Sequence, residues 1–251
     1  MTGALHAGDR GPMVVFVHGV GSTAAIWRHQ LSDLSDAYRC YAVELSGNGA
    51  RKPEAAPHRL SRAAFVDDVL AVADAAGEMR FHFVGCSLGG AVGFELWRRA
   101  PERVKSFTFV GSYAAYPNAH EYVRSIEEAV NAAKSMEAFA RDRATKLGLT
   151  PAREAETVAQ MSAKSRKSYL ATTRATWTGD YRSALASITV PALVICGERD
   201  TIAPLALSHE IFEGITNARL EILENAGHIA NADNPAAFNG VLREFLDAQP
   251  L

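Results

Sequence analysis

The chain has 251 residues, of which 48% are hydrophobic and 22% are charged, and its formal net charge is −2. This length fits one large domain, or one domain that carries an insertion, with enough apolar residues to bury a sizeable core. Acidic and basic residues are interspersed, which gives no electrostatic reason to expect nucleic acid or an anionic membrane as a partner.

Residues 1–111 alternate strand and helix patterns. The N-terminus lacks the basic and apolar regions of a signal peptide, and no apolar run is long enough to span a bilayer, so we expect a cytoplasmic protein. Apolar runs and helical spacings then predict, in chain order, a strand at 13–17, a helix at 26–34, a strand at 38–45, a helix capped by Ser61, a strand at 80–86, a helix at 88–100 and a strand at 104–110. Strands that alternate with helices indicate a mostly parallel sheet covered on both faces.

The pattern changes at about residue 112. Up to residue 185 the strand runs disappear, and the sequence becomes rich in Ala, Lys, Arg and Glu with helical spacing, as at Met136 and Phe139. Strand patterns resume at 190–197 and 219–223, and a helix containing Phe238 closes the chain. We therefore predict an α/β fold with a doubly wound sheet, built from residues 1–111 and 187–251, and a helical insertion over residues 112–186.

A sharp turn is predicted where the strand at 80–86 gives way to a helix. The sequence there is Gly85-Cys86-Ser87-Leu88-Gly89-Gly90. This G-x-S-x-G pattern is typical of the nucleophile elbow, a strained strand-to-helix turn that holds a nucleophilic serine. Side chains two residues from the serine would collide, so glycines occupy both positions. The turn leaves the Leu88 amide free to donate to a developing oxyanion. We predict that Ser87 is a nucleophile and that Leu88 supplies an oxyanion-hole donor.

A serine hydroxyl needs a base to take its proton and a third group to orient that base. His228 lies in a loop after the last predicted strand, and Asp200 follows the strand before it, so both side chains can reach over the carboxyl edge of the sheet. Glu198 is the nearest rival to Asp200, but it follows Gly197 too closely to reach the same place. The order Ser87, Asp200, His228 is the order of a catalytic triad on a doubly wound sheet.

These residues make the chain similar to members of the α/β-hydrolase family over nearly its whole length. The matching motifs are His18-Gly19, the segment from Gly85 to Gly90, the segment from Gly197 to Asp200, and Gly227-His228. The resemblance implies that Val20, which follows the His-Gly pair, supplies the second oxyanion amide, and that the insertion is a helical cap or lid. The C-terminal motifs look most like those of enol-lactone hydrolases and small carboxylesterases.

Two features depart from the family's pattern. Only about a dozen residues precede the first clear strand, so the family's opening hairpin is expected to be shortened or absent. A bare sheet edge invites pairing between subunits, which makes a homodimer an expectation. The loop that begins at Glu44 carries Glu where the family has Asp, and we expect this change to be structural.

The substrate pocket is expected beneath the insertion. Trp177, where the insertion returns toward the sheet, is a candidate pocket residue. The insertion also carries basic side chains that could bind a carboxylate-bearing substrate, although a solvated helix face is the usual place for such residues. They are Arg124, Arg141, Arg143, Lys164, Arg166 and Lys167.

No pair of Cys or His residues shows the spacing of metal ligands. The three cysteines, Cys40, Cys86 and Cys196, lie in or beside apolar runs and fit buried thiols. We therefore expect no metal and no cofactor.

Motifs and resemblance together predict a serine hydrolase that cleaves a small carboxylic ester, a lactone or an enol-lactone through an acyl-enzyme on Ser87. A C–C bond hydrolase or a lyase could use the same triad. An enzyme of a different class is a second alternative, because Gly19-x-Gly21-x-x-Ala24 fits the dinucleotide-binding loop of an NAD(P)-dependent oxidoreductase. This alternative does not explain the presence of Ser87, Asp200 and His228. A third alternative is a non-catalytic ligand-binding protein of the same fold.

Overall fold

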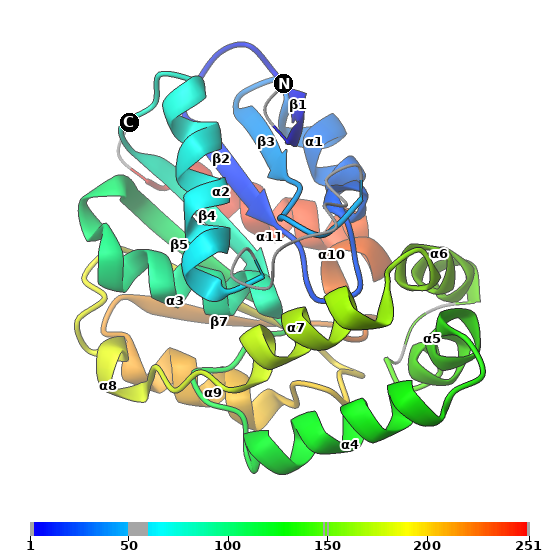
Figure 1. Ribbon diagram of the computed structural model, residues 1–251. Coiled ribbons are helices and arrows are strands. Elements are labelled where there is room, and N and C mark those ends of the chain that lie inside the picture. Colours follow the sequence, from blue (N-terminus) through cyan, green and yellow to red (C-terminus); the bar gives the residue numbers. More distant parts are fainter. Residues whose placement is uncertain (1–2, 50–59, 148, 150, 250–251) are drawn as a thin grey trace.

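A computed structural model describes residues 3–49, 60–147, 149 and 151–249 (Figure 1). The described residues form a sheet of seven strands in the order β1-β3-β2-β4-β5-β6-β7. The strands are β1 (Ala4–Ala7), β2 (Met13–Val17), β3 (Arg39–Val43), β4 (Phe81–Cys86), β5 (Val104–Val110), β6 (Ala192–Gly197) and β7 (Ala218–Leu223). Neighbouring strands from β3 to β7 are parallel, and only β1 runs antiparallel to its neighbour.

Burial along the strands explains why these segments read as continuous apolar runs. Every residue of β2, β4 and β6 is buried, as expected for parallel strands covered on both faces. By contrast β1 has four residues, and its Leu5 is 47% exposed at the edge of the sheet. The predicted α/β fold, with a mostly parallel sheet and a shortened N-terminal element, is confirmed. Pairing of two subunits at this edge stays a prediction.

Helices cover the two faces of the sheet. One face packs against α2 (Arg62–Ala75), α3 (Leu88–Arg99) and α9 (Leu205–Gly214), and the other against α1 (Arg28–Leu34) and α11 (Pro235–Asp247). As predicted, Ser61 caps α2 by accepting a hydrogen bond from the Ala64 amide. Short helical segments fill the connections: η1 (Ala24–Trp27), η3 (Pro101–Arg103), α8 (Arg182–Leu185) and α10 (Ala230–Asp233).

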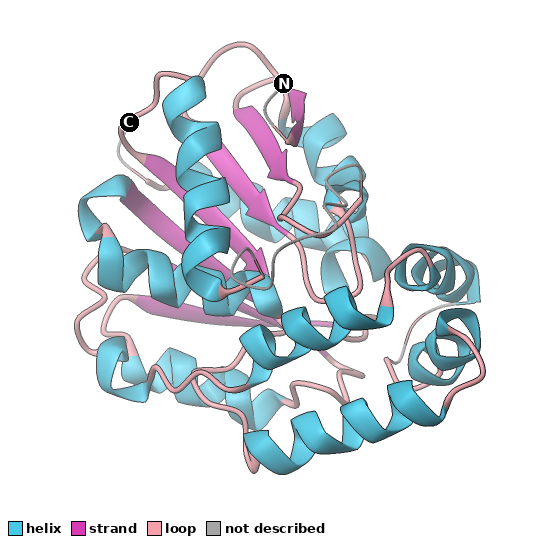
Figure 2. Cartoon of the chain, in the orientation of Figure 1, coloured by secondary structure: helices cyan, strands magenta, loops and turns pink. Residues whose placement is uncertain are grey.

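The segment between β5 and β6 carries four further helices, which lie beyond the ends of the strands (Figure 2). They are α4 (Ala119–Ala132), α5 (Met136–Ala144), α6 (Pro151–Ser162) and α7 (Arg166–Trp177). An isolated antiparallel bridge joins Ala115 to Asp180, where this segment leaves and rejoins the core. We call the residues between these two the cap. The boundaries of the insertion, 112 and 186, stay predictions.

The strand order creates a crevice at the carboxyl ends of β2 and β4. The chain leaves β2 toward β3 on one side and leaves β4 toward β5 on the other. In open α/β sheets this point of divergence is where ligands bind. The residues that follow β2 and β4, including Val20 and Ser87, therefore lie at the place the topology provides for a site.

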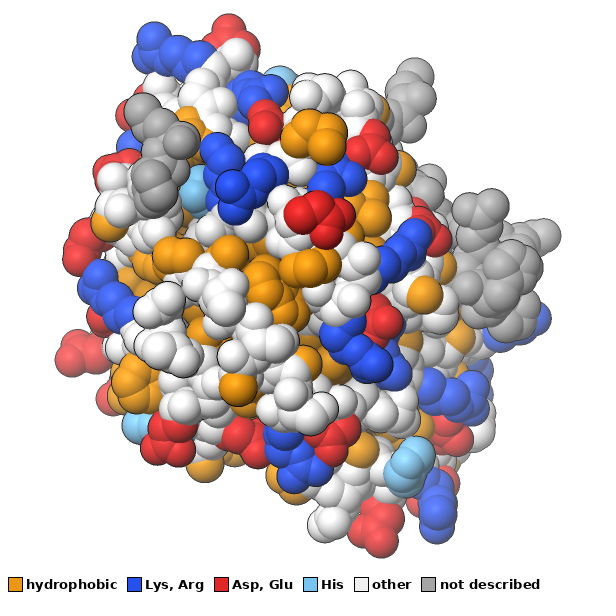
Figure 3. Space-filling view, turned by 90° about the vertical axis from the view of Figure 1, so that its left-hand side faces the viewer, with side chains coloured by type: hydrophobic (Ala, Val, Ile, Leu, Met, Phe, Trp, Pro, Cys, Tyr) orange, Lys and Arg blue, Asp and Glu red, His pale blue; other side chains and the backbone are white. Residues whose placement is uncertain are grey.

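Acidic and basic side chains are mixed on the face of the molecule shown in Figure 3, without a large area of one sign among the described residues there. Among the described residues, no helix has both the length and the apolar character needed to cross a bilayer.

Candidate functional site

Ser87 stands between β4 and α3 in a strained backbone conformation, with φ 53° and ψ −108°. Two glycines make this turn possible. A Cβ at Gly85 would lie 2.4 Å from the Gly89 carbonyl oxygen, and a Cβ at Gly89 would lie 2.2 Å from the carbonyl oxygen of Val17. Both separations are far below van der Waals contact, so the corner closes only with glycine at each position. Backbone strain of this kind concentrates at functional sites.

The hydroxyl of Ser87 is buried and has no hydrogen-bond partner within the part of the chain that the structure describes. An unpaired buried hydroxyl carries a desolvation cost, so its persistence points to a use for the group. The backbone at Gly19 passes close to it, because a Cβ there would lie 3.3 Å from Ser87 Cβ.

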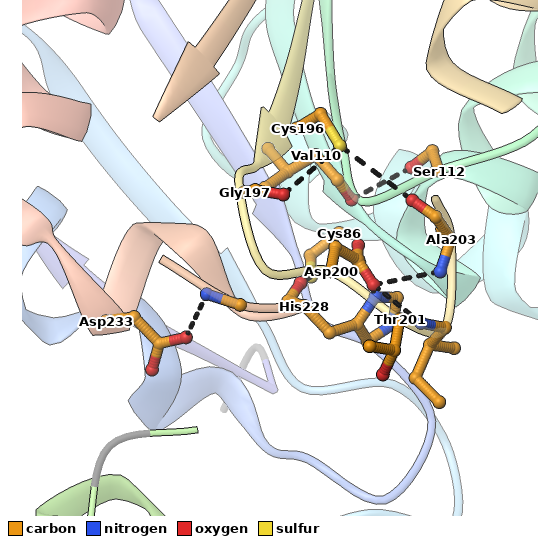
Figure 4. Close-up of polar contacts among 12 residues, drawn as sticks. Cys86, Val110, Ser112, Cys196, Gly197, Asp200, Thr201, Ala203, His228 and Asp233 are labelled. Carbon is orange, nitrogen blue, oxygen red and sulfur yellow. Dashed lines mark hydrogen bonds and ion pairs between the residues drawn. The ribbon is translucent and has the colours of Figure 1, made fainter. Parts of the chain in front are cut away.

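Asp200 and His228 form a buried pair at the ends of β6 and β7 (Figure 4). The imidazole Nδ1 donates to Asp200 Oδ2 over 2.9 Å. The other carboxylate oxygen, Oδ1, accepts from the amides of Ile202 and Ala203, each over 2.9 Å. Three donors thus fix the carboxylate, and they leave Nε2 as the imidazole nitrogen that can act on another group.

Glu198, the rival acid, is directed elsewhere. Its Oε2 accepts from the Asn225 amide over 3.1 Å at the surface. The structure therefore brings Asp200 to His228 and leaves Glu198 outside the pair.

Ser87 and His228 line one cavity between the sheet and the cap. The cavity encloses about 430 Å³ of empty volume but is narrow, with little space open to the centre of a water molecule. No hydrogen bond joins the two side chains among the described contacts. The cavity is lined by Gly19, Val20, Ser22, Cys86, Ser87, Arg143, Leu147, Thr157, Met161, Tyr169, Trp177, His228 and Ile229.

The two predicted oxyanion donors are Val20, in the loop after β2, and Leu88, the residue that follows Ser87. Val20 lines the cavity directly, whereas the Leu88 side chain is buried in the core and its amide begins α3. Neither amide donates to an acceptor among the described residues. The first amides of a helix have no intrahelical acceptor, which leaves the Leu88 N–H available.

Trp177, the last residue of α7, contributes an aromatic wall to the cavity and is 1% exposed. Its indole stacks on Tyr113 with ring centroids 5.1 Å apart and planes 10° apart. The rings of Tyr116 and Tyr122 approach it edge-on, with centroids 4.6 and 4.8 Å away. Aromatic packing therefore holds this wall in place.

Gly111, directly after β5, was not singled out from the sequence. It has φ +51°, and a Cβ there would lie 3.1 Å from Asp200 Oδ2 and 3.1 Å from His228 Nδ1. Any larger residue would crowd the hydrogen-bonded pair. In the sequence, the feature that could have indicated this role is a glycine directly after the strand that pairs with β4.

Asp233 is a second supporting residue that the sequence patterns did not indicate. Its Oδ2 accepts from the Gly227 amide over 2.9 Å, so it supports the loop that carries His228 (Figure 4). Burial raises the pKa of the Asp233 carboxyl above its ordinary value, although the Gly227 amide and nearby positive charges act against the shift.

His18 is buried outside the cavity lining. Its Nδ1 contacts the Gly19 carbonyl oxygen over 2.9 Å, and its Nε2 accepts from the Leu45 amide over 3.3 Å, so it holds two loops together. Glu44 Oε1 accepts from the amide of Ala24, which begins a 3₁₀ helix of only four residues. The 3₁₀ helix continues directly into α1, so the helix alone does not separate the two alternatives. The close approach of Gly19 to Ser87 gives the glycine motif a role beside the serine and favours the hydrolase alternative over the dinucleotide-binding one.

The three cysteines are free and buried. Cys86 lines the cavity beside Ser87, yet burial raises the pKa of its thiol well above the ordinary value. A thiolate is the reactive form of cysteine, so this thiol is not set up as the nucleophile.

A family model described as the alpha/beta hydrolase fold matches residues 12–235. The chain is 29% identical over 247 residues to a protein of Pseudomonas savastanoi pv. phaseolicola assigned as the carbamate hydrolase RutD, covering 95% of both chains.

Two solved structures are similar over nearly the whole chain. A hydrolase from Pseudomonas aeruginosa PA01 has a TM-score of 0.88 at 30% identity, covering 98% of this chain and 94% of that one. An enol-lactonase from Burkholderia xenovorans LB400 has a TM-score of 0.88 at 25% identity, with 97% and 95% covered.

Proposed function

The chain belongs to the family of the alpha/beta hydrolase fold and is an enzyme of the hydrolase type, and from this premise we propose that it is a serine hydrolase of small carboxylic esters or lactones. One observation carries the proposal. The unbonded hydroxyl of Ser87 and the imidazole of His228, oriented by Asp200, line the same small cavity. The arrangement supplies a nucleophile, a base and the group that orients the base.

In the proposed acylation step, His228 Nε2 takes the hydroxyl proton as Ser87 Oγ forms a bond to the substrate carbonyl carbon. The negative charge that develops on the carbonyl oxygen is stabilised by the amides of Val20 and Leu88. When the tetrahedral intermediate collapses, the bond from carbon to the leaving oxygen breaks, and the imidazolium returns its proton to that oxygen. Asp200 stabilises the imidazolium while it exists.

In the deacylation step, a water molecule takes the place of the serine. His228 removes a proton from water, the water oxygen bonds to the acyl carbon, and Ser87 Oγ leaves with the proton restored to it. For a lactone the leaving oxygen belongs to the same molecule, so the product is a single hydroxy acid or, from an enol-lactone, a keto acid.

A carbamate is the second candidate substrate class. The similarity to the relative assigned as a carbamate hydrolase favours it, and its carbonyl carbon can be attacked in the same way to give a carbamoyl-enzyme. A C–C bond hydrolase or a lyase using the same residues remains a third alternative.

The test is a turnover screen combined with covalent labelling. Nitrophenyl esters of increasing acyl length are compared with lactones, enol-lactones and nitrophenyl carbamates. The small cavity predicts the highest kcat/KM for short acyl groups. A serine-reactive phosphonate should label Ser87 in the folded wild-type protein, as located by peptide mass spectrometry, and Ser87→Ala should abolish both labelling and turnover.

Ser112→Ala is the matched control, because Ser112 is a buried serine that hydrogen-bonds to the Val110 carbonyl and does not line the cavity. This variant should keep labelling and turnover. Turnover that survives in Ser87→Ala would refute the proposed nucleophile. A folded wild-type protein that neither reacts with phosphonate nor turns over any substrate would favour the non-catalytic ligand-binding alternative.

A further inference from the structure

Arg143 is set apart from the other basic residues of the cap. Of those considered in the sequence, it alone lines the cavity. Arg141 pairs with Glu137 at the surface, and Arg166 donates to backbone carbonyls of Asn131 and Ala133. Arg124 and Lys167 are exposed, and Lys164 is buried outside the cavity lining.

The guanidinium of Arg143 has only neutral partners. Its Nη2 donates to the Tyr122 hydroxyl over 2.8 Å, and its carbon lies 5.7 Å from the centre of the Tyr122 ring. No carboxylate of the described residues forms an ion pair with it. A partly buried cation without an anion carries a desolvation cost, which a bound anion would offset. Guanidinium groups bind carboxylates through two parallel hydrogen bonds.

The backbone that carries Arg143 is tied to the catalytic loops. Arg143 lies in the last turn of α5, and Lys146 and Leu147 come directly after the residue that caps this helix, Thr145. The Lys146 carbonyl accepts from the Thr201 hydroxyl over 2.9 Å, and the Leu147 carbonyl accepts from the His228 amide over 3.2 Å. The backbone at the end of α5 is therefore tied to the loops of Asp200 and His228, while the hydrogen bond to Tyr122 orients the guanidinium itself.

The surrounding wall offers no competing charge. Tyr122 contacts both Arg143 and the indole of Trp177. Trp177 Nε1 is buried and has no acceptor among the described residues. Apart from His228, Arg143 is the only ionisable cation among the described residues that line the cavity, and no acid lines it.

From these contacts we propose that Arg143 is a specificity-determining residue that binds a carboxylate of the substrate. The inference deepens the proposed function and rests on it: the substrate is an ester or lactone that carries a second, ionised carboxyl group. The carboxylate can belong to the acyl part or to the leaving group. In either case Arg143 holds it while Ser87 attacks the carbonyl.

Two matched substrate pairs test the proposal. The acyl arm compares mono-4-nitrophenyl glutarate with its terminal amide, 4-nitrophenyl glutaramate. The leaving-group arm compares 4-acetoxybenzoate with 4-acetoxybenzamide. The wild-type protein should prefer the carboxylate over the amide in at least one pair, by about 10- to 100-fold in kcat/KM, the factor typical of a charged hydrogen bond.

The variants identify the residue responsible. Arg143→Met should remove the preference by lowering kcat/KM for the carboxylate alone, and Arg143→Lys should retain part of it. Arg141→Met, an exposed position on the same helix, should leave the preference unchanged. Equal turnover of carboxylate and amide by the wild-type protein in both pairs, or an undiminished preference in Arg143→Met, would overturn the inference. If Arg143→Met fails to fold, Arg143→Lys and the expected loss of preference with rising ionic strength decide the question.

A binding measurement separates this inference from the proposed function. Calorimetry on Ser87→Ala should detect glutarate binding that Arg143→Met in the same background abolishes, whereas glutaramide should bind weakly or not at all. If phosphonate labelling and turnover both fail while glutarate still binds through Arg143, the serine mechanism is wrong and the carboxylate site stands. If phosphonate labels Ser87 and glutarate does not bind, the serine mechanism stands and the carboxylate site is wrong.

Discussion

The loops at the carboxyl edge of the sheet and the helices of the cap hold their functional side chains in different ways. At the sheet edge, backbone groups give most of the support: the amides of Ile202 and Ala203 bind Asp200, and glycines at 85, 89 and 111 leave room for Ser87, Asp200 and His228. In the cap, side-chain packing does it, with Trp177 and Arg143 held against tyrosines. Backbone contacts tolerate almost no displacement, whereas packed side chains can be exchanged for others of similar volume.

This difference suggests a division of roles. Changes at the sheet edge should lower kcat for every substrate alike, because they alter the groups that act on the carbonyl. Changes in the cap should alter which substrate is preferred, because they alter the walls of the cavity.

The largest effect is expected at Asp200. Asp200→Asn should lower kcat by about 10³- to 10⁴-fold for all substrates, because the amide no longer holds the imidazole in the productive tautomer or stabilises the imidazolium. Steady-state kinetics over the whole ester series measures this. Glu198→Gln is the matched control and should stay within a few-fold of wild type. A larger loss in Glu198→Gln than in Asp200→Asn would reassign the acid.

A smaller loss is expected at Gly89. In Gly89→Ala the new Cβ meets the Val17 backbone oxygen at 2.2 Å, so the turn must open and the Leu88 amide must move. We expect kcat to fall by about 10²-fold, the usual effect of losing one oxyanion donor, together with a lower Tm.

Gly90→Ala provides the contrast, since its Cβ meets a side chain, Ser112 Oγ, at 2.3 Å. Adding Ser112→Gly should restore Tm and kcat in this variant. No second substitution at Ser112 should rescue Gly89→Ala. Rescue of both variants would show that the elbow is less rigid than the backbone contacts imply.

Next comes a cap residue, Trp177. Trp177→Phe should change the ratio of kcat/KM between short and long acyl esters by about 10-fold, mainly through KM, while phosphonate labelling of Ser87 persists. Trp27→Phe is the control, because Trp27 is fully buried and does not line the cavity. It should lower Tm and leave the ratio unchanged. An equal fall in kcat for all esters in Trp177→Phe would contradict the division of roles.

The smallest effect is expected at Asp233. Its pKa is raised by burial, so the folded state holds this proton more tightly than the unfolded chain. Its contribution to stability is therefore fully present below the ordinary pKa and is lost as pH rises through the raised value. Asp233→Asn should raise Tm at neutral pH by on the order of 2 °C, and the difference should vanish in acid.

Thermal unfolding at several pH values measures this shift. Asp180→Asn is the control, since that carboxylate is exposed and pairs with Arg182 at the surface. It should change Tm by less than about 1 °C. A lower Tm for Asp233→Asn at neutral pH would show that attraction to nearby positive charges outweighs the burial cost.

Sequence patterns predicted the parallel strands β2 to β7, the helices that alternate with them up to residue 111 and the elbow at Ser87, but they did not indicate β1 or α9. The predicted elements depend on local rules: apolar spacing separates strand from helix, and a turn as tight as the one at Gly85 and Gly89 excludes side chains whatever surrounds it. The sequence also indicated Asp200 and His228, because parallel strands must end at a common edge.

Tertiary structure decided the rest. Gly111 matters only because the Asp200 and His228 side chains pass beside it. The cap's basic residues look alike along the chain, and only helix packing turns Arg143 toward the cavity while Arg141 faces solvent. Contacts such as the one from the His228 amide to the Leu147 carbonyl join distant segments. No local pattern encodes them, because they depend on how whole helices pack onto the sheet edge.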